Sequence, residues 1–284
     1  MAGVTASKMR PAPYTSLHAA DLYAASNSFR YEETGDVLQA FQSAFVIQNN
    51  DNFQYLDVGC GTGQFTHDFI LPSCQPCRRL VAVDASIPML EYAKQHFPHK
   101  LIKYEHLDIE GDVSSFVEAH GPFHRVYSFK LLHWAKDLHR ALANISELMI
   151  PGGECLLVFL ARAFVFESFR HLSTTDPWRK YADILLSYIP ASHDILDPSE
   201  LRTYLDSALG SAKLVTLSAE VLLEDGAGIP RTSAIVIPHH ITLLAAPAQL
   251  PAATGAHRWR RAEVKRSNVP FNIVLQLHAR ATSA

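Results

Sequence analysis

The sequence predicts an α/β fold: a doubly wound, mostly parallel sheet with helices on both faces. Three observations support this prediction. Short apolar segments alternate with segments of helical periodicity between about residues 53 and 161. A glycine-rich turn follows the first apolar segment, and acidic residues lie at the ends of three of them. Right-handed connections would bring the carboxyl ends of these strands to one edge of the sheet, where ligands bind in such folds.

The first ordered elements are expected to be two N-terminal helices within residues 17–48. Apolar residues recur there at helical spacing, first at Leu17, Leu22 and Tyr23 and then at Val37, Leu38, Phe41 and Phe45. The polar stretch Gln48–Asn52 ends this region. The helices should therefore precede the sheet and pack on it.

The core of the predicted sheet spans residues 53–161. The first strand, Tyr55–Val58, leads into the glycine turn, and a helix from Gln64 to Leu71 should end at Pro72. Ser86 is the expected N-cap of a helix that continues to Phe97. The remaining expected elements are strands at Leu80–Asp84, Leu101–Leu107, Arg125–Phe129 and Cys155–Leu160, and a helix at Leu138–Met149.

The regular alternation stops after the fifth strand. Residues 162–190 form a long helical stretch rich in aromatic side chains, which can be plain core or a lid over a hydrophobic ligand. A helix at Pro198–Leu209 and a sixth strand at Lys213–Leu223 follow. We therefore expect one domain over residues 1–224 and a divergent segment over residues 225–284.

The charge is unevenly distributed over these two parts. The 284 residues carry a net charge of −3, but residues 225–284 hold seven basic and two acidic side chains. That segment is therefore +5 and residues 1–224 are −8. The overall charge argues against a nucleic-acid-binding protein, and the basic stretch His257–Arg261 is expected to be a solvated tail.

Other compositional features narrow the class of protein further. No apolar run approaches the ~20 residues of a membrane span, and residues 1–13 lack the apolar region of a signal peptide. Four cysteines are too few for a disulfide scaffold and suggest a cytoplasmic setting. Cys74 and Cys77 have C-x-x-C spacing, but without a second pair we expect a plain loop and no metal site.

The glycine turn predicts a cofactor site. Glycines at positions 59, 61 and 63 stand between a strand and a helix, where they permit positive φ and close approach of a ligand. Dinucleotide folds use G-x-G-x-x-G to hold a pyrophosphate, whereas this turn reads G-x-G-x-G and follows Asp57. An acid beside the turn repels a pyrophosphate and favours a positively charged ligand.

S-adenosylmethionine (SAM) has that charge pattern, because it carries a sulfonium and an amino group and no phosphate. Asp57 can attract the positive end, and Asp84 can accept hydrogen bonds from both ribose hydroxyls. Asp108 and the backbone of Ile109 can receive the adenine amino group. The full set of expected cofactor contacts is Asp57, Gly59, Cys60, Gly61, Gly63, Asp84, Ala85, Asp108, Ile109 and Phe129.

The run Leu56–Gly63 resembles motif I of the class I SAM-dependent methyltransferases, which have a Rossmann-like fold. A closer resemblance, over roughly residues 20–215, is to the arthropod juvenile hormone acid (farnesoic acid O-) methyltransferases. The segments that carry it are Leu22-Tyr23, Asn27–Phe29, Asp68–Pro72, Val83–Ser86, Ser128–Trp134, Pro151–Leu160 and Trp178–Tyr181. The family's final sheet hairpin has no recognisable match after about Leu223.

The resemblance implies transfer of a methyl group from SAM to a hydrophobic carboxylic acid such as farnesoic acid or a juvenile hormone acid. It places Trp134 near the transferred methyl, and it puts Arg30 where the family has a substrate-binding glutamine. The adjacent His133 can contact the substrate or simply cap the end of the fourth strand, and beside Trp134 we expect a substrate contact. Such an acid is ionised at pH 7, so no general base is required. Two alternatives remain open: methylation of another small hydrophobic acceptor, and a methyltransferase-like protein that binds without turnover. Antiparallel pairing of residues 235–244 with residues 213–223 would argue against the second alternative.

Overall fold

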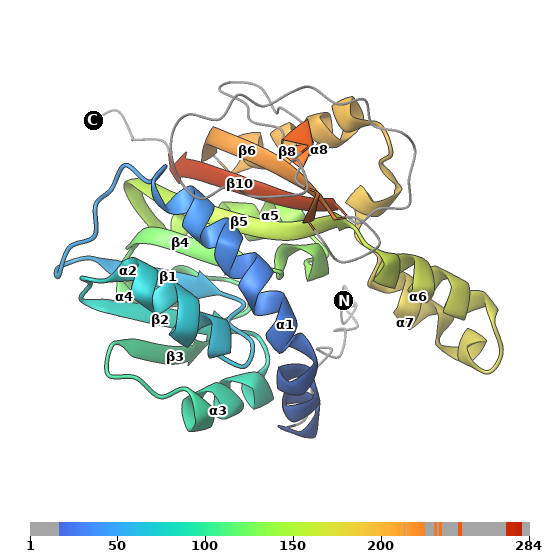
Figure 1. The fold of residues 1–284 in the computed structure, drawn as a ribbon, viewed down its shortest axis with the longest axis horizontal. Helices are drawn as coiled ribbons and strands as arrows, with labels where there is room; N and C mark the ends of the chain where they lie inside the picture. The colour runs from blue at the N-terminus through green and yellow to red at the C-terminus, as the bar shows by residue number, and fades with distance from the viewer. Residues whose placement is uncertain are drawn as a thin grey trace, which may run out of the picture.

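The computed structural model describes residues 17–212, 214–224, 230–231, 233–234, 244–245 and 271–279. In this part of the chain, one large sheet is covered by helices, and the pair α6–α7 projects from the body (Figure 1). The helical elements are α1 (Leu17–Gln42), η1 (Thr66–Ile70), α2 (Leu71–Cys74), α3 (Ile87–His96), α4 (Ser114–His120), η2 (Leu132–Trp134), α5 (Leu138–Glu147), α6 (Phe164–Thr174), η3 (Trp178–Tyr181), α7 (Ala182–Ser187), η4 (Ala191–Asp194) and α8 (Pro198–Ser211). None of the described helices is long and apolar enough to cross a bilayer.

The large sheet has the strand order β3-β2-β1-β4-β5-β10-β6-β7. Its strands are β1 (Gln54–Val58), β2 (Arg79–Asp84), β3 (Ile102–His106), β4 (Phe123–Phe129), β5 (Met149–Arg162), β6 (Leu214–Glu224), β7 (Pro230–Arg231) and β10 (Phe271–Ala279). The pairs among β1 to β5 are all parallel. The predicted α/β class with a doubly wound, mostly parallel sheet is therefore confirmed, and the order reverses between β1 and β4, where ligands bind in such sheets.

The central strands β1, β2, β4 and β5 are buried on both faces of the sheet because they are largely apolar on both sides. All five residues of β1 are buried, as are residues 155–159 of β5. On one face the strands pack against α1 and the η1–α2 helix through an apolar cluster that includes Leu38, Phe41 and Ile70. On the other face a cluster that includes Leu142 and Leu205 joins the strands to α5 and α8.

The N-terminal region contains one helix within residues 17–42 instead of the predicted two. Gly35 lies inside this helix without ending it, and the ring of Phe69 takes the space where a side chain would stand. A Cβ built on Gly35 would lie 2.6 Å from Phe69 Cδ1. The glycine thus serves a close contact between α1 and the next helix.

The sequence predicts that the helix after the glycine turn ends at Pro72. In the structure this helix continues to Cys74, so the prediction is wrong at this end. The reason is a π-helical turn at Thr66–Ile70, in which the Leu71 N–H bonds to the Thr66 carbonyl five residues back. Pro72 then occupies one of the first positions of α2, where its missing N–H does no harm.

The sixth strand is confirmed at Leu214–Glu224, and its antiparallel partner comes from far along the chain. β10 lies between β5 and β6 and pairs antiparallel with both. It brings residues 271–279, from the segment that the sequence leaves unassigned, into the main sheet. Of residues 235–244 the structure describes only Leu244, in β9 (Leu244–Ala245), which pairs with β8 (Ser233–Ala234).

Candidate functional site

The glycine turn leaves the end of β1 at the edge where the strand order reverses. Gly59, Gly61 and Gly63 all have positive φ, at 84°, 54° and 79°. The N–H groups of Gly59 and Cys60 donate to the Val83 carbonyl at 2.7 and 3.0 Å, which ties the turn to β2. Positive φ at three of five residues is strained for any residue with a side chain, so the turn requires glycine.

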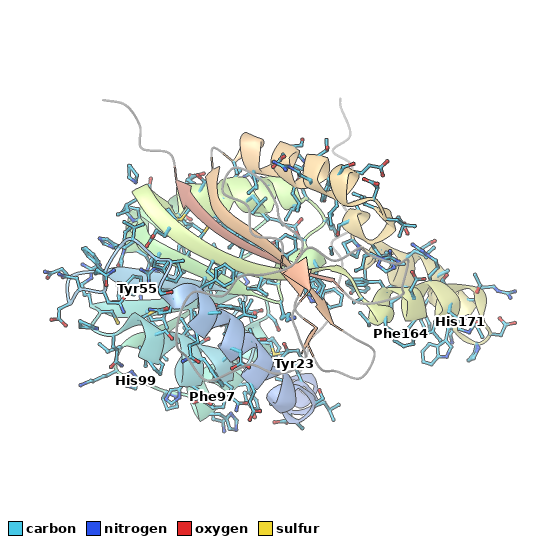
Figure 2. All side chains as sticks on the ribbon, turned by 45° about the horizontal axis from the view of Figure 1, so that its top comes forward. Tyr23, Tyr55, Phe97, His99, Phe164 and His171 are labelled. Carbon is cyan, nitrogen blue, oxygen red and sulfur yellow. The ribbon has the colours of Figure 1, made fainter. Side chains whose placement is uncertain are left out.

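The three glycines differ in what surrounds them. A Cβ on Gly59 would lie 2.7 Å from Leu131 Cβ, and a Cβ on Gly63 would lie 2.7 Å from Ala93 Cβ. A Cβ on Gly61 would meet nothing closer than Tyr23 Cε1 at 3.8 Å; Tyr23 is labelled on α1 in Figure 2. Gly59 and Gly63 are therefore needed for packing, whereas Gly61 leaves its side of the turn open to a ligand.

Asp57 is a buried carboxylate with little compensation for its charge. It is 2% exposed, and its Oδ2 accepts a 2.6 Å hydrogen bond from the Thr66 hydroxyl in the π-helical turn. Burial raises the pKa of Asp57 to about 7; the Thr66 hydrogen bond opposes this and the nearby Asp84 adds to it. A positive group brought to this carboxylate would restore its ordinary ionisation.

Asp84 ends β2 and is oriented by backbone donors. Its Oδ2 accepts the Gly61 N–H at 2.9 Å and its Oδ1 accepts the Ser86 N–H at 2.8 Å. Burial raises the pKa of Asp84, while the bonds from Ser86 and Gly61 oppose that shift. Each carboxylate oxygen keeps a second lone pair that can accept a ligand hydroxyl. The exposed Ala85 follows it, and Ser86 is the N-cap of α3, as predicted, with Oγ accepting the Met89 N–H.

Asp108 is exposed beyond the end of β3, and its Oδ1 accepts the Glu110 N–H at 3.0 Å. The buried Ile109 follows, but its carbonyl already accepts a 2.6 Å bond from the amide of Asn144. The Asp108 carboxylate is thus the more accessible acceptor of the two. Asn144, on the buried side of α5, is a residue of this site that the sequence did not single out for this role. Its position among the apolar residues of the predicted helix could have indicated a buried amide that needs hydrogen-bond partners.

The segment after β4 holds the next group of expected residues. Phe129 is 9% exposed, with its ring 4.9 Å from the Phe65 ring. Lys130 has a φ of 57°, the one positive value recorded for a residue other than glycine in the described chain. Its N–H bonds to the Val158 carbonyl at 2.6 Å, which holds this unfavourable backbone in place. Strain of this kind concentrates at functional sites, and the sequence contains no local signal for it.

His133 and Trp134 lie on η2, directly after this strained residue. His133 is 5% exposed, and its Nδ1 accepts the Leu160 N–H at 3.4 Å. Burial lowers the pKa of His133 to about 3, with a further contribution from Lys130. The ring is therefore neutral, bonded to the β5 backbone and packed against the rings of Trp134 and Phe166.

Trp134 belongs to an aromatic cluster formed with the helical stretch after β5. Its ring centroid lies 5.9 Å from that of Phe166 and 6.0 Å from that of Tyr188, both nearly perpendicular. Phe169 extends the cluster at 6.2 Å from Tyr188. The helices after β5 thus cover the end of β4 with aromatic side chains.

Two further features singled out in the sequence are Arg30 and the pair Cys74 and Cys77. Arg30 lies in α1, but its side chain is outside the described residues; its neighbour Tyr31 has its hydroxyl 3.5 Å from Thr62 Oγ1, next to the glycine turn. Cys74 and Cys77 are buried free thiols on the side of the sheet that faces α1. In the part of the chain that the structure describes, no group of three or more His, Cys, Asp or Glu side chains could hold a metal ion.

Comparison with known proteins identifies the class. A family model described as a methyltransferase domain matches residues 56–157, which include the glycine turn and the three acids. A Haloferax volcanii chain, solved in a complex of the Trm112 methyltransferase activator with a methyltransferase, aligns with 92% of this chain and 97% of its own at a TM-score of 0.51 and 14% identity. A Bacillus halodurans structure, also titled as a methyltransferase, gives 0.50 at 13% identity over 85% and 98%. The protein is a SAM-dependent methyltransferase with the class I fold.

The curated relatives narrow this class to a family. Juvenile hormone acid O-methyltransferase of Drosophila melanogaster is 32% identical over 213 residues, which cover 74% of this chain and 71% of the relative. The Bombyx mori protein of the same name is 32% identical over 65% of each chain. A malonyl-[acyl-carrier protein] O-methyltransferase of Pectobacterium atrosepticum is 32% identical over 41% of this chain and 42% of its own. The chain belongs to the family of the juvenile hormone acid O-methyltransferases.

The residues at the strand ends fit SAM. Among the residues that the structure describes, the buried Asp57 has no cation beside it, Gly61 leaves an open approach, and Asp84 is held in place with accepting lone pairs to spare. These features match a positive amino acid end and a ribose with two hydroxyls. The predicted cofactor is therefore consistent with the donors and acceptors that this chain presents.

Proposed function

We propose that the protein methylates a hydrophobic carboxylic acid, of the farnesoic acid or juvenile hormone acid type, to its methyl ester. Two curated relatives with juvenile hormone acid in their names support this choice of substrate. The fold and the family model define a methyltransferase but not its substrate class. Our choice of a carboxylic acid rests on the residues that follow the end of β4, above all on His133.

The observation that carries the proposal is the state of His133. With its Nδ1 bonded to the Leu160 N–H and its pKa near 3, this ring is a poor general base. A hydroxyl acceptor would need such a base, whereas a carboxylate is already ionised at pH 7. SAM, when bound, would supply a methyl group on a positive sulfur. A carboxylate oxygen would form the new C–O bond as the C–S bond breaks and S-adenosylhomocysteine leaves, and no proton has to be removed.

The residues of this chain contribute binding, orientation and exclusion of water. Asp57 and Asp84 hold the cofactor's amino group and ribose, and Asp108 receives its adenine. The cluster of Trp134, Phe166, Phe169 and Tyr188 offers an apolar wall for an isoprenoid chain. Because an anion and a cation lose charge as they react, a desolvated aromatic site favours the transition state.

Two residues of η2 and α1 complete the proposed substrate site. His133, after the end of β4, acts as a positioning residue for Trp134, because its Nδ1 is bonded to the Leu160 N–H and its ring lies 4.8 Å from the Trp134 ring. Arg30, one residue before Tyr31 on α1, binds the substrate carboxylate through its planar guanidinium. The four free cysteines favour a cytoplasmic location for the reaction.

Transfer of a labelled methyl group from SAM tests the proposal. Farnesoic acid, a fatty acid of similar length and benzoic acid are offered as acceptors, with farnesol as the matched acceptor that lacks a carboxylate. We expect label in the ester of farnesoic acid and none in farnesol. Arg30 stands where the family has a glutamine, so the substrate of this chain can differ from that of its relatives. Preferential transfer to another of the acids would support the alternative that the protein methylates a different small hydrophobic acceptor. SAM binding without transfer to any acceptor would favour a binding protein without turnover.

A further inference from the structure

The projection formed by α6, η3 and α7 has an exposed stripe of two aromatic side chains and one aliphatic side chain. Trp178, Tyr181 and Ile184 are 48%, 43% and 47% exposed. Their spacing of three residues places them on one side of the η3–α7 segment, and the two rings lie 6.3 Å apart. Both views show the projection standing away from the sheet, with Phe164 and His171 on α6 marked in Figure 2.

Exposed apolar side chains are concentrated here compared with the rest of the described chain. Six of the ten large apolar residues with high exposure lie between residues 164 and 186: Phe164, Val165, Trp178, Tyr181, Ile184 and Leu186. Phe164 alone is 76% exposed. Single exposed apolar residues are normal, but a cluster on a projecting element marks a contact surface.

The same projection touches the candidate site on its inner side. Phe166 is fully buried against Trp134 and His133, at ring distances of 5.9 and 6.0 Å. Phe169 reaches Trp134 through Tyr188. A contact on the outer side is therefore a few side chains away from the proposed substrate wall.

The charges of the projection indicate what would cover it. Arg179 and Lys180 stand exposed between the two rings, and Asp176 lies 4.0 Å from the Arg179 Nε. Residues 162–194 hold four basic side chains (Arg162, Arg170, Arg179, Lys180) and four acidic ones (Glu167, Asp176, Asp183, Asp194), a net charge of zero. A zwitterionic phospholipid layer complements such a mixed surface, because it offers phosphates and amines at the depth where indole and phenol rings settle.

We propose that the stripe of Trp178, Tyr181 and Ile184 docks this enzyme on a zwitterionic phospholipid surface, from which the aromatic inner side of the projection receives an acid substrate. The docking is peripheral, since a single turn of aromatic side chains reaches only the headgroup boundary. The delivery step rests on the proposed function, because only a hydrophobic acid partitions into that surface.

Sedimentation with phosphatidylcholine vesicles tests the docking without substrate or turnover. The full chain is compared with the double variant Trp178→Ser/Tyr181→Ser and with a matched double variant at exposed apolar positions elsewhere, Val46→Ser/Ile87→Ser, which are 69% and 48% exposed. We expect at least a fivefold lower vesicle affinity for the first variant and less than a twofold change for the second. Because the projection is neutral, raising the salt to 0.5 M should change the affinity less than twofold.

Three outcomes overturn the docking proposal. In the first, the wild-type chain stays in the supernatant at all lipid concentrations. In the second, the two double variants lose vesicle binding equally. In the third, the chain self-associates in sedimentation velocity and the Trp178→Ser/Tyr181→Ser change abolishes this association, which assigns the stripe to a second copy of the chain.

A second readout separates this proposal from the proposed function. Methyl transfer is measured with the acid presented in vesicles and with the same acid carried by albumin. Docking predicts that the Trp178→Ser/Tyr181→Ser variant is at least fivefold slower only with the vesicle-borne acid. Equal slowing in both presentations contradicts delivery from the surface. Absence of transfer by the wild-type chain in both presentations, with vesicle binding intact, overturns the proposed function and the delivery step while the docking stands.

Discussion

Two neighbouring rows of residues on the same face of the sheet differ in how their buried charges are paired. One row contains Tyr55, Arg125 and Glu154, which are paired in register across β1, β4 and β5. The next row toward the carboxyl ends contains Asp57 and Tyr127. Since side chains alternate between faces along a strand, both rows face the side covered by α1.

The charges of the first row are satisfied within the protein. Glu154 is fully buried, and its oxygens accept the N–H groups of Val46 and Ile47 and meet Arg125 Nη2 at 3.2 Å. The guanidinium also lies over the Phe45 ring and bonds to the Ile47 carbonyl. This network fastens the chain after α1 to the sheet.

The carboxylate of the second row has no cation beside it in the part of the chain that the structure describes. Asp57 accepts a bond from the neutral Thr66 hydroxyl and stands near a second acid, Asp84. The difference shows that a buried acid with its own arginine supports the fold, whereas one without a cation is suited to a positively charged ligand. Substitutions in the two rows should therefore have opposite effects on stability.

The largest effect is expected from Arg125→Met in the first row. Removing the guanidinium leaves Glu154 buried and unpaired, so the free energy of unfolding should fall by about 3–5 kcal/mol. Urea denaturation of wild type and variant measures the loss. Arg179→Met, which breaks an exposed pair with Asp176, is the matched control and should change stability by less than about 1 kcal/mol. Equal losses in the two variants would contradict the structural role of the first row.

The next effect is opposite in sign and comes from Asp57→Asn. The pKa of Asp57 is about 7 in the folded protein and about 3.9 in an unfolded chain, so folding favours the protonated form. Wild-type stability should therefore decrease as the pH rises from about 4 to 7, by up to about 4 kcal/mol. At pH 8, without SAM, the variant should be more stable than wild type, while near pH 4 the two should match.

The same substitution should weaken SAM binding at least tenfold by isothermal titration calorimetry at pH 7.5. Asp108→Asn, at an exposed acid, is the control for stability and should leave it nearly unchanged at both pH values. A destabilised Asp57→Asn protein at pH 8 would show that the second row is a structural network like the first.

The contrast between the rows also explains which features the sequence could predict. The strands, the glycine turn, the acids at the strand ends and the Ser86 cap are local patterns, and the structure contains all of them. The network of Arg125 and Glu154 is not visible in the sequence, because its members are 29 residues apart and meet only through strand pairing.

The errors share the same physical origin, since they arise from contacts between distant segments. Gly35 lies inside the single helix α1 against the ring of Phe69, and the continuation past Pro72 accompanies a π-helical turn whose Thr66 bonds to Asp57. β10 enters the sheet between β5 and β6 after an intervening segment of more than forty residues. Periodicity and capping rules contain no information on such pairings.

A finer test of the second row uses Thr66→Val, which removes the hydrogen bond to the Asp57 carboxylate. SAM affinity should rise with pH as Asp57 ionises, with a midpoint near 7 in wild type. A hydrogen bond to a charged group contributes about 1.5–3 kcal/mol, so the variant's midpoint should be higher by about one to two pH units. Binding is measured from pH 5.5 to 7.5, below the range where an α-amino group loses its own proton. Within this window the shift is read from the slope: wild-type affinity should flatten toward pH 7.5, whereas the variant's affinity should still rise about tenfold per pH unit.

Thr66→Ser keeps the hydroxyl and should leave the midpoint within about half a unit of wild type. The other titratable groups near Asp57 are Asp84, Cys60, Tyr104 and Cys74; burial raises the pKa of the two thiols and the phenol, which are neutral over this range. An unshifted midpoint in Thr66→Val would mean that another group controls SAM binding.

The smallest effect on stability distinguishes the two ends of the sheet through matched glycines. Gly61 and Gly152 both have positive φ and room for a methyl group: the nearest atom to a Cβ is Tyr23 Cε1 at 3.8 Å for Gly61, and none lies within 4 Å for Gly152. Each change to alanine should lower the free energy of unfolding by about 1–2 kcal/mol, because the backbone strain is similar. Only Gly61→Ala should also weaken SAM binding, by tenfold or more, since its Cβ would stand where the cofactor approaches the turn. Denaturation measures the stability of both variants, and calorimetry measures their SAM affinity. If SAM affinity fell equally in Gly152→Ala, the carboxyl edge of the sheet would not differ from the amino edge in ligand binding.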